Sequence, residues 1–258
     1  MKKFILLNVL ILTTSFCFAA EYRTVLLISI DALHPDAVSK VNSPNIMSLA
    51  DNGAYSPLAT STNPPKTLIA HTAMLTGLKP SENGKTDNVW QTGEPTVSKS
   101  TLLSTAKNKG YQTFLIYSKQ KLGYLKNSAT DTEIFAKDEA VEKTAEVLDT
   151  SKKQFIFLHI SGLDTEGPIS GWMSAEYIDE FRFIDEQLGI LFKKALNSPS
   201  SLIIITSDHA GHDRTHGSDH PEDFKRPLAV YSSLKKIKQI PESALQIDGL
   251  KKFIEEEF

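Results

Sequence analysis

The chain has little cysteine, no apolar run long enough to span a membrane and no extended cluster of basic residues, and each of these absences argues against a class of protein. Its only cysteine, Cys17, lies within the first twenty residues, so the rest of the chain forms neither disulfides nor thiolate metal sites. An apolar run over residues 4–12 is too short for a committed membrane span. Lysines and arginines are scattered along the chain, which argues against a groove for polymeric nucleic acid.

The first twenty residues have the order of a secretory signal peptide. Two lysines precede the apolar run, and two alanines close the segment at positions 19 and 20. We therefore expect residues 1–20 to be cleaved, with retention as a membrane anchor as the alternative. Residues 21–258 then form a single domain that is periplasmic or secreted, without stable membrane insertion. Loss of the two lysines changes the formal charge from −3 to −5.

Apolar runs alternate with amphipathic segments along the rest of the chain. The pattern predicts buried strands at residues 23–30, 111–117, 154–160, 201–207 and 225–232. It predicts helices at 43–53, 67–77, 101–110, 138–150 and 174–196, and from about residue 246. Ser43 and Ser174 are the expected N-caps of two of these helices. Buried strands separated by helices indicate an α/β fold, in which a mostly parallel central sheet has helices on both faces.

Polar residues follow three of the predicted strands. Asp31, Asp164 and the pair Asp208–His209 come shortly after the runs that end near residues 30, 160 and 206. Ligands of open α/β sheets bind outside the carboxyl ends of the strands, so we expect these side chains at one edge. A single aspartate there is an ordinary loop residue, whereas three acids beside a histidine-rich stretch indicate a shared cation.

Carboxylate oxygens and imidazole nitrogens are ligands of Zn²⁺ and related divalent metals. The candidates suffice for two ions: Asp31, Asp164, Asp208, His209, His216 and, as a further candidate, His212. Two metal ions about 4 Å apart suit phosphoryl transfer, which also needs a nucleophile. Thr67 opens a predicted helix, where free N–H groups and the helix dipole favour a phosphate. Thr67 is therefore the candidate nucleophile, and a capping role is compatible with this.

Five segments carry a specific resemblance to a known family. They are "VLLISIDALHPD", "SPNIMSLADNGA", "PPKTLIAHTAMLTGLKPSENG", "DTEGPISGWMSAEY" and "SDHAGHDRTHGSDHPEDFKRPLAVY". Their order and spacing resemble the alkaline phosphatase superfamily, in particular its type I phosphodiesterase/nucleotide pyrophosphatase family. The resemblance covers nearly all of residues 21–258. It implies an alkaline-phosphatase-like sheet, two Zn²⁺ ions and a covalent phospho-threonine or phospho-serine intermediate.

The resemblance also assigns roles to residues of this chain. Asp31, Thr67, Asp208 and His209 fall on the ligands of one ion, with Thr67 as the nucleophile. Asp164 and His216 fall on ligands of the second ion. Asn88 falls on the asparagine that donates a hydrogen bond to a phosphate oxygen in the transition state.

One position departs from the family pattern. After Asp164 the family reads D-x-x-G-H-x-x-G, and here Pro168 stands at the histidine. Three interpretations remain open. In the first, His212 or Glu166 substitutes as a ligand of the second ion. In the second, the second site is weak, and catalysis is slow or uses a single metal. In the third, the protein binds a phosphate compound without turning it over.

The expected function is that of an exported, metal-dependent hydrolase of phosphodiester or pyrophosphate bonds. Zn²⁺ is the expected cofactor at two sites, Pro168 leaves open whether the second is full or weak, and another divalent metal is the alternative. The expected partner is a small phosphate ester or nucleotide. A phosphomonoesterase or sulfatase of the same superfamily is the alternative enzyme, and a weakened phosphate-binding homologue is the alternative outside catalysis. The sequence predicts no oligomeric state and no particular substrate.

Overall fold

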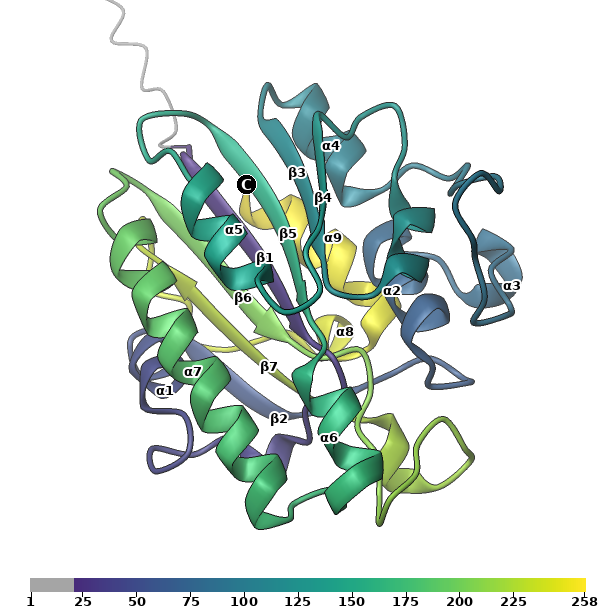
Figure 1. Cartoon of the computed structure of the whole chain (residues 1–258). Coiled ribbons are helices and arrows are strands. Elements are labelled where there is room, and N and C mark those ends of the chain that lie inside the picture. Colours follow the sequence, from purple (N-terminus) through teal and green to yellow (C-terminus); the bar gives the residue numbers. More distant parts are fainter. Residues whose placement is uncertain (1–20) are drawn as a thin grey trace, which may run out of the picture.

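The computed structural model describes residues 21–258, so the expected signal peptide lies outside the described residues. The described residues form one seven-stranded sheet (Figure 1). Its strands are β1 (Thr24–Ile30), β2 (Ala54–Thr60), β3 (Gln112–Tyr117), β4 (Thr132–Phe135), β5 (Gln154–Ile160), β6 (Ser201–Thr206) and β7 (Lys225–Ser232). They lie in the order β2-β7-β6-β1-β5-β3-β4.

The centre of the sheet is parallel and one edge is antiparallel. Strands β6, β1, β5, β3 and β4 pair in parallel, whereas β7 pairs antiparallel with both β6 and β2. The expectation of a mostly parallel sheet is therefore confirmed. Because the parallel strands run in one direction, their carboxyl ends meet at one edge, near α6 (Gly162–Ser170) in Figure 1.

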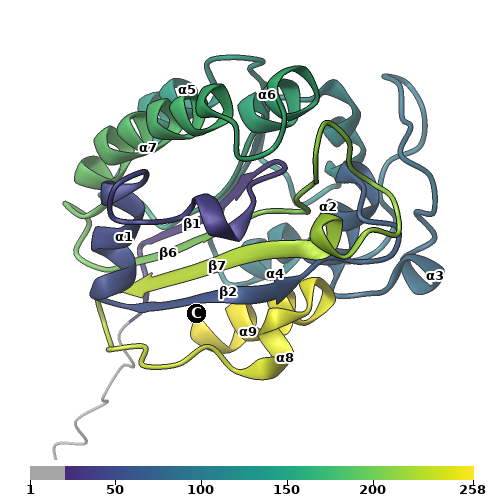
Figure 2. The ribbon, with the colours of Figure 1, turned by 90° about the horizontal axis from the view of Figure 1, so that it is seen from below.

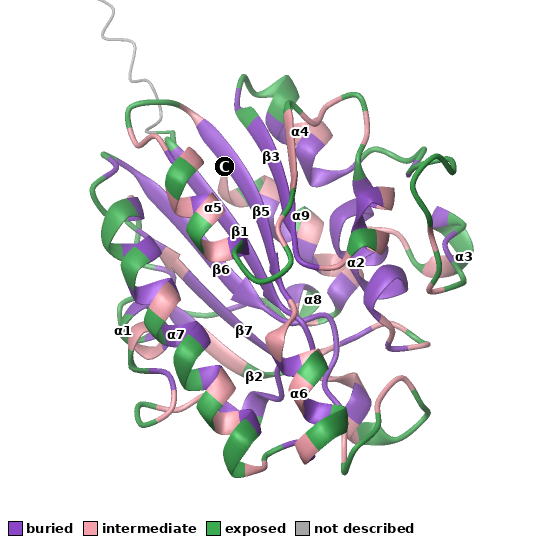
Figure 3. Ribbon diagram, in the orientation of Figure 1, coloured by how far each residue is buried: buried purple, intermediate pink, exposed green. Residues whose placement is uncertain are grey.

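Helices cover both faces of the sheet, as expected (Figure 2). One face carries α1 (Pro44–Asp51), α5 (Ala140–Val147), α6 and α7 (Ala175–Ala195). The other carries α2 (Thr67–Thr76), α4 (Leu102–Asn108) and α9 (Leu250–Glu257), with the short helices α3 (Pro80–Asn83) and α8 (Glu242–Leu245) nearby. The central strands β1, β5 and β6 are buried throughout, whereas α5 and α7 expose their outer faces to solvent (Figure 3).

The alternation of side chains along β1 explains the two cores. Every residue of β1 is buried. Val25 and Leu27 join the core beneath α2, α4 and α9, and Leu26 and Ile28 join the core beneath α1, α5 and α7. Successive side chains of a strand point to opposite faces, so a strand covered on both faces has to be apolar throughout.

The predicted central strands are confirmed, while elements built from less apolar residues were missed. Strand β2 carries Pro57 and several exposed side chains, as an antiparallel edge strand can. Strand β4 was missed because it is short and only partly buried. Helix α6 was not predicted, since its glycines and Pro168 give it no clear helical signal.

The cap of α1 comes from another helix. Ser43 precedes the helix as expected, but its side chain makes no capping hydrogen bond. The carboxylate of Asp185, on α7, instead accepts hydrogen bonds from the Asn45 N–H at 3.0 Å and the Ile46 N–H at 2.9 Å. The helices approach closely at Gly189, where a Cβ atom would lie 2.6 Å from the Asn45 side chain. At Ser174 the predicted cap is confirmed, because its hydroxyl accepts from the Tyr177 N–H.

Membrane-spanning helices were searched for among residues 21–258. None of the helices there is both long and apolar enough to cross a bilayer.

Candidate active site

Three neighbouring strands place acids and a histidine at one edge of the sheet. Asp31 directly follows β1, and Asp208 and His209 follow β6. Asp164 lies in the first turn of α6, just after β5. Because β6, β1 and β5 are adjacent in the sheet, these side chains meet although they are far apart in the sequence.

The first group of ligand atoms consists of Asp31 Oδ1, Asp208 Oδ2 and His209 Nε2. The nitrogen lies 3.4 Å from the Asp31 oxygen and 3.3 Å from the Asp208 oxygen. Tetrahedral Zn²⁺ with ligands at about 2.0–2.1 Å has neighbouring ligand atoms about 3.3–3.4 Å apart. All three atoms are buried and have no hydrogen-bond partner among residues 21–258. The spacing and the unpaired atoms fit a divalent cation at the centre of this group.

Other atoms of the same residues are hydrogen-bonded in ways that orient the ligands. His159 Nε2 donates to Asp31 Oδ2 at 2.9 Å, because His159 Nδ1 already accepts from the Ser118 N–H. His209 Nδ1 donates to the Ala210 carbonyl at 2.9 Å, which leaves Nε2 as the free acceptor. Such outer contacts fix the ring and its tautomer for metal binding.

The turn after Asp31 has a strained backbone conformation that helps to position Asp208. Ala32 has φ of +64°, in the left-handed region that alanine rarely adopts. In this conformation its N–H donates to Asp208 Oδ1 at 3.2 Å. Its carbonyl accepts from Tyr177 Oη and from Trp172 Nε1. The turn therefore joins the ends of β1 and β6 and holds Asp208 in place.

The second group of ligand atoms is less complete. His216 Nε2 lies 3.2 Å from Asp164 Oδ1, and the His216 ring stacks on the His209 ring with centroids 4.8 Å apart. Asp164 Oδ1 is buried without a hydrogen-bond partner among the described residues. Pro168 lies one turn further along α6 and is exposed. It offers no donor atom, so this group has fewer ligands than the first.

Lys119 is the site residue that sequence reasoning missed. Its Nζ contacts Asp31 Oδ2 at 2.6 Å and also forms an ion pair and hydrogen bond with Asp164 Oδ2. The same nitrogen donates to Thr67 Oγ1 at 3.3 Å. A signal was available, because Lys119 follows β3 as Asp31 follows β1. A lysine is no metal ligand when protonated, however, so a pattern of acids and histidines does not include it.

Ion pairing shifts the pKa values of Lys119 and Asp31. Burial disfavours the charged form of Lys119, but Asp31 and Asp164 outweigh this and raise the pKa of the lysine above its ordinary value. Burial likewise disfavours the charged form of Asp31, but Lys119 and the His159 N–H hold the pKa of Asp31 well below its usual range. The ammonium and the carboxylate are therefore both charged at neutral pH.

Thr67 and Asn88 meet at the start of α2. Thr67 is the first residue of the helix and Lys66 is its N-cap, so Thr67 itself is not the cap. Asn88 Oδ1 accepts from the Leu68 N–H at 2.8 Å. His71, one turn along, donates from Nδ1 to the Thr67 carbonyl at 2.7 Å and lies 3.5 Å from Asp208 Oδ2. The start of α2 is thus linked to Asn88 through Leu68 and, through His71, to Asp208.

His212 and Glu166 lie apart from the second group. His212 Nδ1 lies 2.7 Å from Asp223 Oδ1, and its ring stacks on His220 with centroids 3.8 Å apart. These three form a separate group of ligand-type side chains. The Glu166 carboxylate accepts from the Ser170 hydroxyl and borders a hollow between α5, α6 and α7. Neither is brought together with Asp164 and His216.

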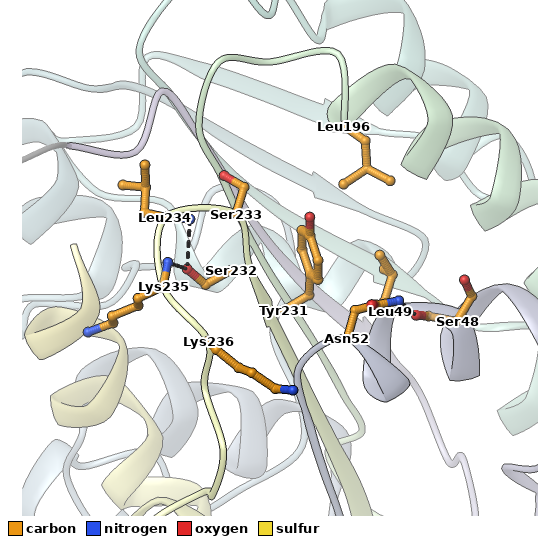
Figure 4. Close-up of a pocket in the computed structure, with 10 residues that line it drawn as sticks. All are labelled: Ser48, Leu49, Asn52, Leu196, Tyr231, Ser232, Ser233, Leu234, Lys235 and Lys236. Carbon is orange, nitrogen blue, oxygen red and sulfur yellow. Dashed lines mark hydrogen bonds between the residues drawn. The ribbon is translucent and has the colours of Figure 1, made fainter.

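A hollow of about 450 Å³ lies away from these groups (Figure 4). It is formed where α1 and α7 end, beside the last residues of β7. Because β7 is antiparallel to β6, this is the edge of the sheet opposite the acids. Its lining contains Lys235 and Lys236 but no aspartate, glutamate or histidine. The hollow therefore offers no competing set of carboxylate and imidazole metal ligands.

Comparison with known families agrees with this geometry. The model of the family described as type I phosphodiesterase / nucleotide pyrophosphatase matches residues 25–236. The resemblance expected from the sequence motifs is therefore confirmed.

Individual relatives are more distant. GPI ethanolamine phosphate transferase 1 of Yarrowia lipolytica is 34% identical over 109 residues, which cover 39% of this chain and 11% of that protein. The C-terminal periplasmic domain of EcEptC from Escherichia coli, in complex with Zn, has a TM-score of 0.65 at 16% identity, covering 92% of this chain and 82% of that one. Murine ectonucleotide pyrophosphatase/phosphodiesterase 5 has a TM-score of 0.61 at 18% identity, covering 73% and 57%. These likenesses show the expected alkaline-phosphatase-like fold.

Proposed function

Because this chain belongs to the type I phosphodiesterase/nucleotide pyrophosphatase family, we propose that it is a metal-dependent hydrolase of phosphodiester or pyrophosphate bonds. One observation carries the proposal. Three unpaired, buried ligand atoms of Asp31, Asp208 and His209 converge at the edge of the sheet, and Lys119 Nζ links Asp31 to the Thr67 hydroxyl at the start of α2. This arrangement suits attack of a hydroxyl on a phosphate held by positive charge.

Thr67 is the proposed nucleophile. Its Oγ1 attacks phosphorus, the bond to the leaving oxygen breaks, and a phospho-threonine forms, which water then hydrolyses. The start of α2 favours the negative phosphoryl group, because the positive end of the helix dipole lies there. An inactive threonine-to-alanine variant of the murine phosphodiesterase 5 is known in complex with AMP, which supports a threonine in this role and a nucleotide-like substrate.

A divalent cation held by Asp31, Asp208 and His209 would favour loss of the Thr67 proton and draw charge from the phosphoryl group. Zn²⁺ is the proposed ion, supported by the Zn complex of the EcEptC domain. Asn88 is held beside Thr67 by its bond to the Leu68 N–H. Its amide is proposed to donate to a phosphate oxygen, where it opposes the charge of the transition state.

Export is proposed from residues 1–20, whose lysines, apolar run and closing alanines have the pattern of a secretory signal peptide. The enzyme would then act in the periplasm or outside the cell. The periplasmic origin of the EcEptC domain supports this location.

Transfer of the phosphoryl group to an alcohol is the second candidate function, and it is favoured by the GPI ethanolamine phosphate transferase relatives. The chain spans only about a tenth of their length. In this reaction an acceptor hydroxyl replaces water in the second step, and the residues of the first step are the same.

Substitution of Thr67 tests the proposal. With bis-p-nitrophenyl phosphate and Zn²⁺, Thr67→Ala should lower kcat by at least about a thousandfold, because the attacking oxygen is gone. Thr67→Ser should retain measurable turnover and accumulate a phosphorylated peptide in mass spectra. Thr72→Ala is the matched control, since it removes a buried hydroxyl of the same helix that bonds only to the Leu68 carbonyl.

Full activity of Thr67→Ala would remove Thr67 as the nucleophile. A substrate panel extends the test to diesters, monoesters, nucleotides and sulfate esters, each with and without Zn²⁺ and with an added alcohol acceptor. Preference for a monoester or sulfate ester would replace the diesterase assignment. A transfer product in excess of hydrolysis would favour the second candidate.

A further inference from the structure

The second group of ligand atoms does not fit a divalent cation as the first group does. Asp164 and His216 are joined only by His209 among the ligand-type side chains of residues 21–258, and His209 also belongs to the first group. Pro168 contributes no donor atom. One oxygen of Asp164 is already engaged by Lys119. A second divalent ion would therefore find few ligands and would lie close to an ammonium, whose charge repels it.

The ammonium of Lys119 has three oxygen partners at this position. It donates hydrogen bonds to Asp164 Oδ2 and Thr67 Oγ1, and it forms an ion pair with Asp31 Oδ2 at 2.6 Å. The side chain is only 18% exposed, so its charge is little screened by water. The nitrogen thus bridges the acids of the two ligand groups and touches the proposed nucleophile.

We propose that Lys119 replaces the second metal ion, so that the centre works with one divalent cation and one ammonium. The inference rests on the proposed function. The charges of the buried acids support it. Metal-binding carboxylates are deprotonated, so Asp31, Asp164 and Asp208 would contribute three negative charges to the centre, and one divalent ion with one ammonium would contribute three positive charges. Two divalent ions and the ammonium would leave an excess of two positive charges in a mostly buried site.

The sheet order explains why a lysine can take this place. Lys119 follows β3, and β5 lies between β3 and β1. The side chain must therefore reach across the end of a neighbouring strand to contact Asp31. The flexible four-carbon stem of lysine has the length for this. On the way it passes α6, where it contacts Asp164.

The proposal gives Lys119 a defined chemical role. As the Thr67 oxygen gives up its proton to water and forms a bond to phosphorus, the ammonium 3.3 Å away stabilises the negative charge on the reacting oxygens. Lys119 keeps its proton throughout, and the electron pair of the broken P–O bond leaves with the departing oxygen. The ammonium acts by charge alone.

Metal counting tests the proposal. Purified full-length protein and variants are equilibrated with excess Zn²⁺, desalted, and assayed for bound zinc by mass spectrometry and by calorimetric titration. The wild-type protein should hold one Zn²⁺ per chain. Pro168→His should also hold one, because the ammonium still engages Asp164. Lys119→Met combined with Pro168→His should hold two. Lys126→Met, which removes a lysine paired with Glu133 at 2.8 Å, is the control and should hold one.

Each other outcome overturns the proposal in a recognisable way. Two ions on the wild-type protein would show that the ammonium does not exclude the second metal, while the proposed function would stand. One ion on the double variant would show that Lys119 does not occupy the second position. No ion on the wild-type protein would contradict the metal-dependent function itself. The wild-type count does not depend on whether any variant folds.

Turnover gives a second measurement. Lys119→Met should lower kcat for bis-p-nitrophenyl phosphate about a hundredfold, as expected when one charge-stabilising group is lost. With Zn²⁺, kcat of the double variant should be at least about tenfold higher than kcat of Lys119→Met, because a second metal ion can then bind. Unchanged kcat in Lys119→Met, or no recovery in a double variant that holds two ions, would overturn the proposed role.

Discussion

The Asp185 carboxylate, which caps a helix from another helix, provides a test of the packing. Asp185 is 1% exposed and receives three hydrogen bonds of 2.9–3.0 Å, from the Asn45 and Ile46 N–H groups and from the Asn45 side chain. Loss of a helix cap costs about 0.5–2 kcal/mol, and a hydrogen bond to a charged group contributes about 1.5–3 kcal/mol. Relief of the buried charge offsets part of the sum, so we expect Asp185→Ala to lower the free energy of unfolding by about 3 kcal/mol.

Urea and thermal denaturation measure this effect. For a chain of this size, about 3 kcal/mol corresponds to a fall in Tm of about 6–12 °C. Asp179→Ala is the control on the same helix, because its exposed carboxylate pairs only with Arg182, and it should change the unfolding free energy by less than about 0.5 kcal/mol. An Asp185→Ala protein within about 1 kcal/mol of wild type would refute the assignment of Asp185 as the cap that joins α1 to α7.

Two further predictions concern the site. Removal of metal with EDTA should lower Tm, and Zn²⁺ at about a hundred times its Kd should restore about 2.7 kcal/mol of stability. In thermal melts, His209→Ala should abolish this gain and His212→Ala should retain it. Equal gains in the two variants would contradict the assignment of His209 to the first ligand group. Burial lowers the pKa of His71 to about 4 from 6.5, so on acidification the unfolded chain takes up this proton near pH 6.5 and the folded protein only near pH 4. The unfolding free energy should therefore fall by about 2 kcal/mol between pH 7 and pH 5 on account of His71. Urea titrations of His71→Gln should lack this component, and parallel pH profiles for the two proteins would disprove it.

The parts of the fold that the sequence could predict are those with a local signal. Strands β1, β5 and β6 are continuous apolar runs because both of their faces are covered, and this pattern needs no knowledge of their neighbours. The strand β2 has no such signal, since it is stabilised by pairing with β7, which lies far along the chain. The cap of α1 could likewise not be predicted from the local sequence, because Asp185 is 139 residues from Ile46.

The candidate site shows the same division. The rule that ligands gather beyond the carboxyl ends of parallel strands was enough to bring Asp31, Asp164, Asp208 and His209 together. Lys119 obeys the same rule, but its charge is opposite to that of a metal ligand. Only the sheet order, with β3 two strands from β1, reveals that its ammonium reaches Asp31. The contact of His212 with Asp223 also depends on how a loop folds back, which residue spacing does not specify.

The position of β1 has a consequence for how the chain folds. This strand comes first among the described residues, yet its two partners come late: Thr24 pairs with Gln154 and with Ser201. The central strand therefore stays unpaired until more than half of the chain has been synthesised. Parallel pairing over such sequence separations closes large loops before any contact forms, which makes folding slow. This apolar strand is exposed during that interval, and exposed apolar strands of nascent chains are prone to aggregate.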